Sequence, residues 1–146
     1  MRLPGLPVLG ALAAAALGLA VVLLWPREEV TVEDAVRSRI EALTAAAESR
    51  QLGALTDGLS ESFRSKQGLT KDSARGYLAG LILQGEWLRV FATDLEVKEM
   101  SETSATFEGT FVFVRAGNAM SRYDLSGTFV NEDDTWRMTE ASEHRR

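Results

Sequence analysis

The sequence has no cysteine and a single histidine, His144, among its 146 residues. Without thiols it has no disulfides, no thiolate metal ligands and no cysteine nucleophile. One histidine and scattered carboxylates show no metal-ligand spacing, and no glycine-rich phosphate loop is present. His144 also stands next to the chain end, where fraying leaves a general base without a fixed partner. We therefore expect neither a metal nor a cofactor.

Basic side chains are scarce as well. Sixteen lysines and arginines face 21 aspartates and glutamates, which gives a formal net charge of −5. Nucleic-acid binding depends on cations that neutralise phosphates, so this balance argues against a nucleic-acid partner. It also argues against broad adhesion to an anionic membrane surface. The acids are scattered, and we interpret them as a solvated surface.

Charge is absent from one long stretch, Leu6 to Trp25. As a helix this stretch spans about 30 Å, the thickness of a bilayer core. We interpret it as an uncleaved signal anchor, so that the chain divides into a transmembrane helix (1–25), a linker (26–30) and one domain (31–146). A cleaved signal peptide is the alternative, because Ala13 to Ala16 offers small residues. We expect the N-terminus in the cytoplasm and the domain outside, because short tails ahead of a first span usually stay inside. The alanine and arginine usage is typical of bacteria, so the outside is expected to be a periplasm or the cell exterior.

Three helices are predicted after the linker. Thr31 resembles an N-cap, and an apolar stripe at helical spacing predicts a first helix from about Val32 to Arg50. Leu52, Leu55 and Leu59 continue that spacing as a shorter second helix, and the polar segment 60–69 is predicted to be a loop. Thr70 is the expected cap of a third helix, with Gly85 just past its end.

Strands follow, because apolar and polar residues alternate with a period of two. In the first strand the apolar residues change parity, so either both faces are covered or a bulge intervenes. The other strands have one apolar face, which indicates an antiparallel sheet with one wet side. The predicted strands are 87–97, 105–115, 121–131 and 136–142.

The expected fold class is therefore α+β, with three N-terminal helices packed on a curved antiparallel sheet of about four strands, preceded by one transmembrane helix. This order resembles the nuclear transport factor 2-like (NTF2-like) superfamily, which includes the polyketide-cyclase-like enzymes. The segment SRQLGALTDGLSESF is similar to the family's turn into a short second helix. The ending GTFVNEDDTWRMTEASEH is similar to its last hairpin. The resemblance implies a cone with a pocket at its open end, and dimerisation through the sheet.

The resemblance also implies acid–base groups inside the cone for any member that is an enzyme. Arg89 and Asp94 are weak catalytic candidates, because one of them points inward if the strand is regular. Glu140 shares parity with the inward residues of the last strand. Aromatic side chains with polar tips suit a site for an apolar ligand, although a plain core reads the same way. The ligand-binding candidates are Tyr77, Trp87, Phe111 and Tyr123.

The predicted function is a membrane-tethered, non-catalytic interaction or assembly module of the bacterial cell envelope. Its expected partners are the membrane, through residues 6–25, an envelope protein and a second copy of the chain. Two alternatives remain open: a domain that binds a small apolar ligand, and a cofactor-free isomerase, cyclase or hydratase. Fold alone does not decide among them, because function in such a fold depends on the pocket.

Overall fold

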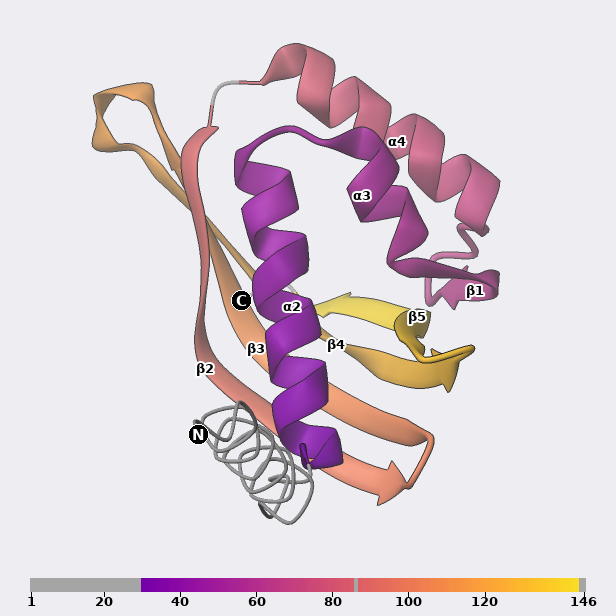
Figure 1. Ribbon diagram of the computed structural model, residues 1–146. Helices are drawn as coiled ribbons and strands as arrows, with labels where there is room; N and C mark the ends of the chain where they lie inside the picture. The colour runs from indigo at the N-terminus through magenta and orange to yellow at the C-terminus, as the bar shows by residue number, and fades with distance from the viewer. Residues whose placement is uncertain (1–29, 86, 145–146) are drawn as a thin grey trace, which may run out of the picture.

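A computed structural model describes residues 30–85 and 87–144. Its elements follow the expected α+β order, with one strand more than the alternation predicts (Figure 1). The helices are α2 (Val32–Glu48), α3 (Leu52–Asp57) and α4 (Lys71–Gln84). The strands are β1 (Leu59–Ser65), β2 (Trp87–Ser101), β3 (Ser104–Arg115), β4 (Met120–Glu132) and β5 (Thr135–His144), with a short 3-10 turn, η1 (Ala116–Asn118), between β3 and β4.

The sheet is mixed and has the strand order β1-β5-β4-β3-β2. Strands β2 to β5 pair in antiparallel fashion, whereas β1 runs parallel to β5. Helix α2 lies along the inner face of the sheet, and α3 and α4 continue the helical layer toward one end (Figure 1). The expectation of about four antiparallel strands is therefore wrong in one respect: the sheet has five strands, and one pair is parallel.

Strand β1 was missed because its sequence does not alternate clearly. Leu59 was expected in the second helix and residues 60–69 in a loop, but the helix ends at Asp57 and the strand begins at Leu59. Only Leu59 and Phe63 are apolar and buried, and their spacing of four residues reads as helical. The strand forms because β5 provides partners: the amide of Met138 donates to the Gly58 carbonyl at 2.8 Å.

The helix boundaries follow from local chemistry. The Thr31 hydroxyl accepts a hydrogen bond from the Asp34 amide at 3.1 Å, which confirms the predicted cap of α2. That helix ends at Glu48, two residues before the predicted end. Thr70 and Ser73 form a reciprocal capping box at the start of α4, and Gly85 follows its last turn, as predicted. Gly85 has a negative φ, so its role is close packing: a Cβ there would lie 3.0 Å from the guanidinium carbon of Arg50.

A β-bulge explains the change of parity in β2. The register between β2 and β3 shifts between Thr93 and Glu96, and Asp94 has a φ of 52°. Val90, before the bulge, and Val97, after it, are both buried although they differ in parity. The bulge is thus confirmed over the alternative of two covered faces, and bulges of this kind bend a strand.

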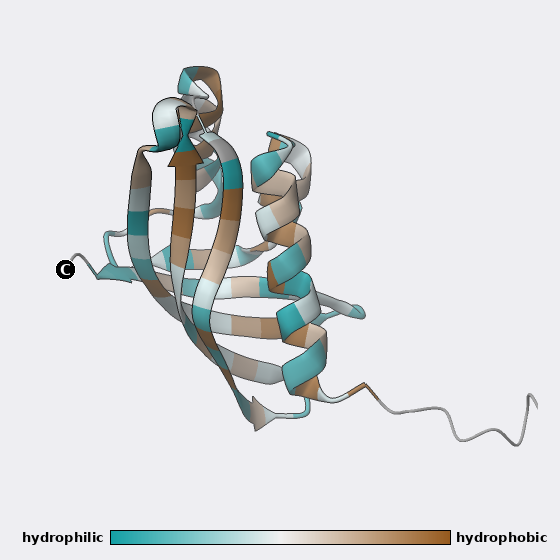
Figure 2. Cartoon of the chain, turned by 90° about the vertical axis from the view of Figure 1, so that its left-hand side faces the viewer, coloured by the Kyte–Doolittle hydropathy of each residue, from teal (hydrophilic) through white to brown (hydrophobic). Residues whose placement is uncertain are grey.

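The sheet also bends at β4. Gly127 lies beside Phe107 of β3, and a Cβ on Gly127 would meet a Phe107 ring carbon at 2.8 Å as well as the Glu140 carbonyl. The register between β4 and β5 shifts at the next residues, Thr128 and Phe129. Glycine therefore lets the Phe107 ring cover the backbone where the sheet curves, and Figure 2 shows the resulting curvature of the strands.

Two apolar clusters form the core. The larger joins α2 to the inner face of β2 to β5 through residues such as Val36, Phe107 and Phe129. The smaller joins β1 to α4 through Leu59, Phe63 and Ala74. All described helices and strands and both clusters lie between residues 32 and 144, so this part has a core of its own and meets the usual criterion for independent folding.

Two glycines in α4 with open space beside them allow a test of this arrangement. A Cβ at Gly76 or Gly80 would meet nothing within 4 Å. We therefore expect Gly76→Ala and Gly80→Ala each to raise the free energy of unfolding by about 0.5–1 kcal/mol, because alanine loses less backbone entropy in a helix. Urea unfolding of residues 27–146 measures the change. Gly127→Ala is the matched control and lowers the same quantity by about 1–3 kcal/mol through overpacking; a loss of stability at both α4 positions would contradict the packing described.

The predicted membrane anchor, residues 6–25, lies outside the described residues. Among residues 30–85 and 87–144, no helix is both long enough and apolar enough to cross a bilayer.

Candidate functional site: an apolar cavity between the helices and the sheet

A cavity of about 230 Å³ lies between the helices and the inner face of the sheet. It is larger than the 150 Å³ engineered cavity that stays dry and binds benzene, and smaller than most drug-sized sites. Helix α4 contributes a half-buried stripe of Leu78, Leu81 and Ile82. The other helices and the sheet supply the remaining lining: Ile40, Leu43, Thr44, Ala47, Leu55, Gly58, Leu59, Trp87, Val90, Phe107, Phe111, Phe113, Leu125, Phe129 and Met138.

No lining residue of this cavity is ionisable. Its two polar side chains already have partners on α2. The Trp87 indole N–H donates to the Ala47 carbonyl at 2.7 Å, and the Thr44 hydroxyl donates to the Glu41 carbonyl at 2.8 Å. The cavity wall therefore offers dispersion contacts and no acid–base pair, whereas proton transfer needs a titratable group within hydrogen-bond reach.

Aromatic rings form the sheet side of the cavity. Trp87 and Phe113 meet edge to face with centroids 5.7 Å apart, and Phe107 lies 5.3 Å from Phe129. Such pairs hold one another in place, because edge-to-face contacts add to the energy of burial. The rings therefore fix the shape of the cavity on this side.

The four predicted ligand-binding residues are divided by the structure. Trp87 and Phe111 line the cavity. Tyr123 lies opposite Phe111 in the register and meets Phe113 edge to face at 5.5 Å, but it is not part of the lining. Tyr77 is 59% exposed on α4, one residue before Leu78, and does not reach the cavity.

The two weak catalytic candidates lie away from the cavity. Arg89 is exposed, with its guanidinium 5.4 Å from the centroid of the Phe91 ring. Asp94 is exposed at the bulge and borders an open groove on the outer face of the sheet, together with His144. One of these two side chains would point inward only in a regular strand, and the bulge makes β2 irregular.

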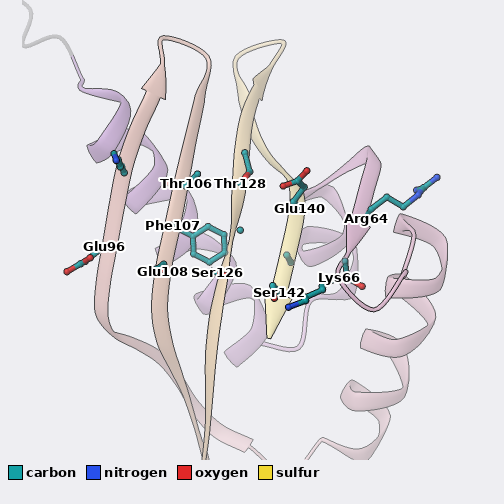
Figure 3. Close-up of a pocket in the computed structure, with 14 residues that line it drawn as sticks. Arg64, Lys66, Glu96, Thr106, Phe107, Glu108, Ser126, Thr128, Glu140 and Ser142 are labelled. Carbon is teal, nitrogen blue, oxygen red and sulfur yellow. The ribbon is translucent and has the colours of Figure 1, made fainter. Parts of the chain in front are cut away.

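The outer face of the sheet carries a second open groove, of about 690 Å³ (Figure 3). Its walls combine hydroxyl and charged side chains of both signs with the Phe107 ring, and Glu96 and Glu108 lie at one side and Arg64 and Lys66 at the other. Glu140, which shares parity with the inward residues of the last strand, nevertheless lines this outer groove and is exposed. None of the groups of acidic side chains or histidine in the described ranges is arranged to hold a metal ion.

Sequence reasoning missed most of the cavity wall. The stripe on α4 was recognised as a helix face, but nothing in its spacing separates a core contact from a cavity contact. Leu125 and Met138 have the parity of inward residues in β4 and β5 and carry the same ambiguity. Residues that enclose empty space have the same periodicity as residues that fill it.

Comparison with known proteins identifies the fold. No family model matches the sequence, and no curated protein sequence matches it. An NTF2-like protein of unknown function from Shewanella oneidensis MR-1 superposes with a TM-score of 0.64 at 18% identity, over 75% of this chain and 96% of that one. An NTF2-like protein of unknown function from Pseudomonas putida KT2440 gives 0.67 at 10% identity, over 78% and 86%.

A third similar structure is named for an enzyme, scytalone dehydratase, and comes from Novosphingobium aromaticivorans DSM 12444. It superposes with a TM-score of 0.62 at 14% identity, over 77% of this chain and 87% of that one. At these identities the comparisons show the fold alone, so residues 30–85 and 87–144 have an NTF2-like, or cystatin-like, α+β fold with three helices on a five-stranded mixed sheet.

Proposed function

We propose that this NTF2-like domain is a non-catalytic binding domain that takes up a small apolar molecule in its cavity. The observation that carries the proposal is the composition of the cavity wall, which has aliphatic and aromatic side chains and no ionisable group. An isomerase, cyclase or hydratase is the least supported alternative, because it needs an acid or base beside the substrate.

The proposed location follows from the sequence. Residues 6–25 are long and apolar enough to anchor the domain in a membrane, with the N-terminus in the cytoplasm and the domain on the far side. Removal of these residues is expected to release the domain from the membrane fraction. If a signal peptidase cleaves the segment, the mature protein lacks it and the domain is secreted.

A tethered interaction or assembly module of the cell envelope is the second candidate, and exposed apolar side chains on α4 favour it. Leu83 is 88% exposed and Tyr77 is 59% exposed. Exposed apolar patches on a folded domain commonly mark contact sites, although single side chains are ordinary. Within the described residues the outer face of the sheet carries no helix (Figure 2), which is compatible with a second copy pairing there.

Native mass spectrometry of the protein purified gently from its own host tests these two candidates together. The ligand proposal predicts a retained small-molecule mass on the domain that disappears on unfolding. The interaction proposal predicts a co-purifying protein that is lost from a Leu83→Lys variant. A bare chain that also takes up no added apolar molecule would contradict the ligand proposal.

A further inference from the structure

A smaller pocket of about 190 Å³ adjoins the apolar cavity where β2 begins and β3 ends. It shares Leu81 and Trp87 with the cavity, and it adds the polar side chains of Gln84 and Arg115. The two spaces are therefore neighbours across the Leu81 and Trp87 side chains. The cavity has no ionisable group in its wall, whereas the smaller pocket has a cation and an amide in its wall.

The register of the sheet determines where Arg115 lies. It lies directly opposite Trp87 in the pairing of β2 with β3. Side chains of directly opposite residues stand on the same face, so Arg115 shares the inner face with Trp87. Arg115 is exposed, and no salt bridge to it is found within residues 30–85 and 87–144.

A second guanidinium lies at the same end. Nη2 of Arg50 donates to the Trp87 carbonyl at 3.3 Å. Its charge adds to the positive potential around Trp87. Glu48 also contributes to this end of β2, because its Oε2 accepts from the Val90 amide at 3.4 Å. The polar end of the cavity thus has two cations close to Trp87, and the only polar groups inside the cavity are already hydrogen-bonded.

We propose that the ligand is an amphipathic anion, a medium-chain carboxylate, with its tail in the cavity and its head group at Arg115. This inference rests on the proposed function and adds the chemical class of the ligand. A 150 Å³ cavity holds the six carbon atoms of benzene, so about 230 Å³ holds about nine. The planar guanidinium of Arg115 matches a carboxylate in two-point geometry, and the Gln84 amide is a further donor.

Photolabelling of the full chain in phosphatidylcholine nanodiscs tests the inference. The probes are octanoate and 1-octanol that carry a diazirine at the tail end, and labelled peptides are mapped by mass spectrometry. Unlabelled octanoate and octanol compete for the site. The variants are Arg115→Gln and the conservative Arg115→Lys. Arg122→Gln is the matched control, because Arg122 is an exposed arginine on β4 that borders the outer groove beside Asp94 and does not line the cavity.

We expect octanoate to protect the cavity peptides at a lower concentration than octanol does. In Arg115→Gln the protecting concentration of octanoate rises about three- to tenfold, that of octanol stays within about twofold, and Arg115→Lys recovers part of the difference. If octanoate and octanol protect the cavity peptides at equal concentrations, and Arg115→Gln does not change these concentrations, the ligand is not an anion. That result would not contradict binding of an apolar molecule in the cavity. If neither α4 nor the strands that line the cavity are labelled, the proposed function is wrong as well.

Discussion

Phe129→Ala is expected to lower the free energy of unfolding by about 3–5 kcal/mol. The Phe129 side chain is fully buried in the larger apolar cluster, and its ring packs against Phe107. Alanine removes these contacts, and the space left behind joins the existing cavity, which the rigid strands on either side cannot close. Because small domains are stable by only about 5–15 kcal/mol, the variant has lost much of its margin.

Chemical denaturation of residues 27–146, monitored by tryptophan fluorescence, measures this loss. Met120→Ala is the control, because Met120 is 57% exposed at the start of β4 and its truncation should cost less than about 0.5 kcal/mol. A loss below about 1 kcal/mol for Phe129→Ala would show that the ring is not a central part of the core.

Filling the cavity from α2 should remove binding and leave the fold intact. Ala47 lines the cavity, and leucine at this position adds three carbon atoms to its interior. Each displaced methylene of a ligand costs about 0.8 kcal/mol of burial, so Ala47→Leu should weaken 1-octanol binding by about 2 kcal/mol, or about 30-fold. Ala47→Phe adds six carbon atoms and should abolish binding.

Calorimetric titration of 1-octanol into each variant measures the effect. Ala45→Leu and Ala45→Phe are matched controls, because Ala45 lies on the same helix but is exposed and does not line the cavity. The two controls should bind octanol as the unmodified domain does. Equal binding by the Ala47 and Ala45 variants would place the octanol site elsewhere.

The helices and the four long strands were predictable because their signals are local. Thr31 and Thr70 have side chains that cap helices, and the alternation in β3 and β4 continues over a dozen residues. The anomaly in β2 was also visible, since the parity of its apolar residues changes near Asp94. The local sequence therefore predicts most of the elements and the irregularity of β2, but not the position of its bulge.

Strand β1 was not predictable because its stability is not local. Leu59 and Phe63 supply only two buried apolar residues, and the strand exists because β5 accepts it as a parallel neighbour. Parallel pairing joins segments that are far apart in sequence, and no tight turn with a recognisable sequence connects them. The sequence therefore predicts a second helix that is too long, and it predicts a loop where the polar strand β1 forms.

The candidate site was only partly predictable. Their aromatic side chains identified Trp87 and Phe111 as candidates for a site that binds an apolar ligand, but the exposure of Tyr77 depends on how α4 is rotated over the sheet. The outward positions of Arg89 and Asp94 depend on the bulge. Arg115 was overlooked because a charged residue at a strand end ordinarily points to solvent, and only its pairing with Trp87 places it beside the cavity.

A methyl NMR titration of residues 27–146 with 1-octanol tests whether the cavity binds an apolar molecule. We expect saturable shifts of the cavity methyls of Leu78, Ile82 and Leu125, whereas Val112, which lines an outer groove and not the cavity, should be unaffected. The same titration of Ala47→Phe should leave the cavity methyls unshifted. If the methyl resonances of the cavity residues do not shift when octanol is added to the unmodified domain at high concentration, the cavity is not a binding site and the proposed function is wrong.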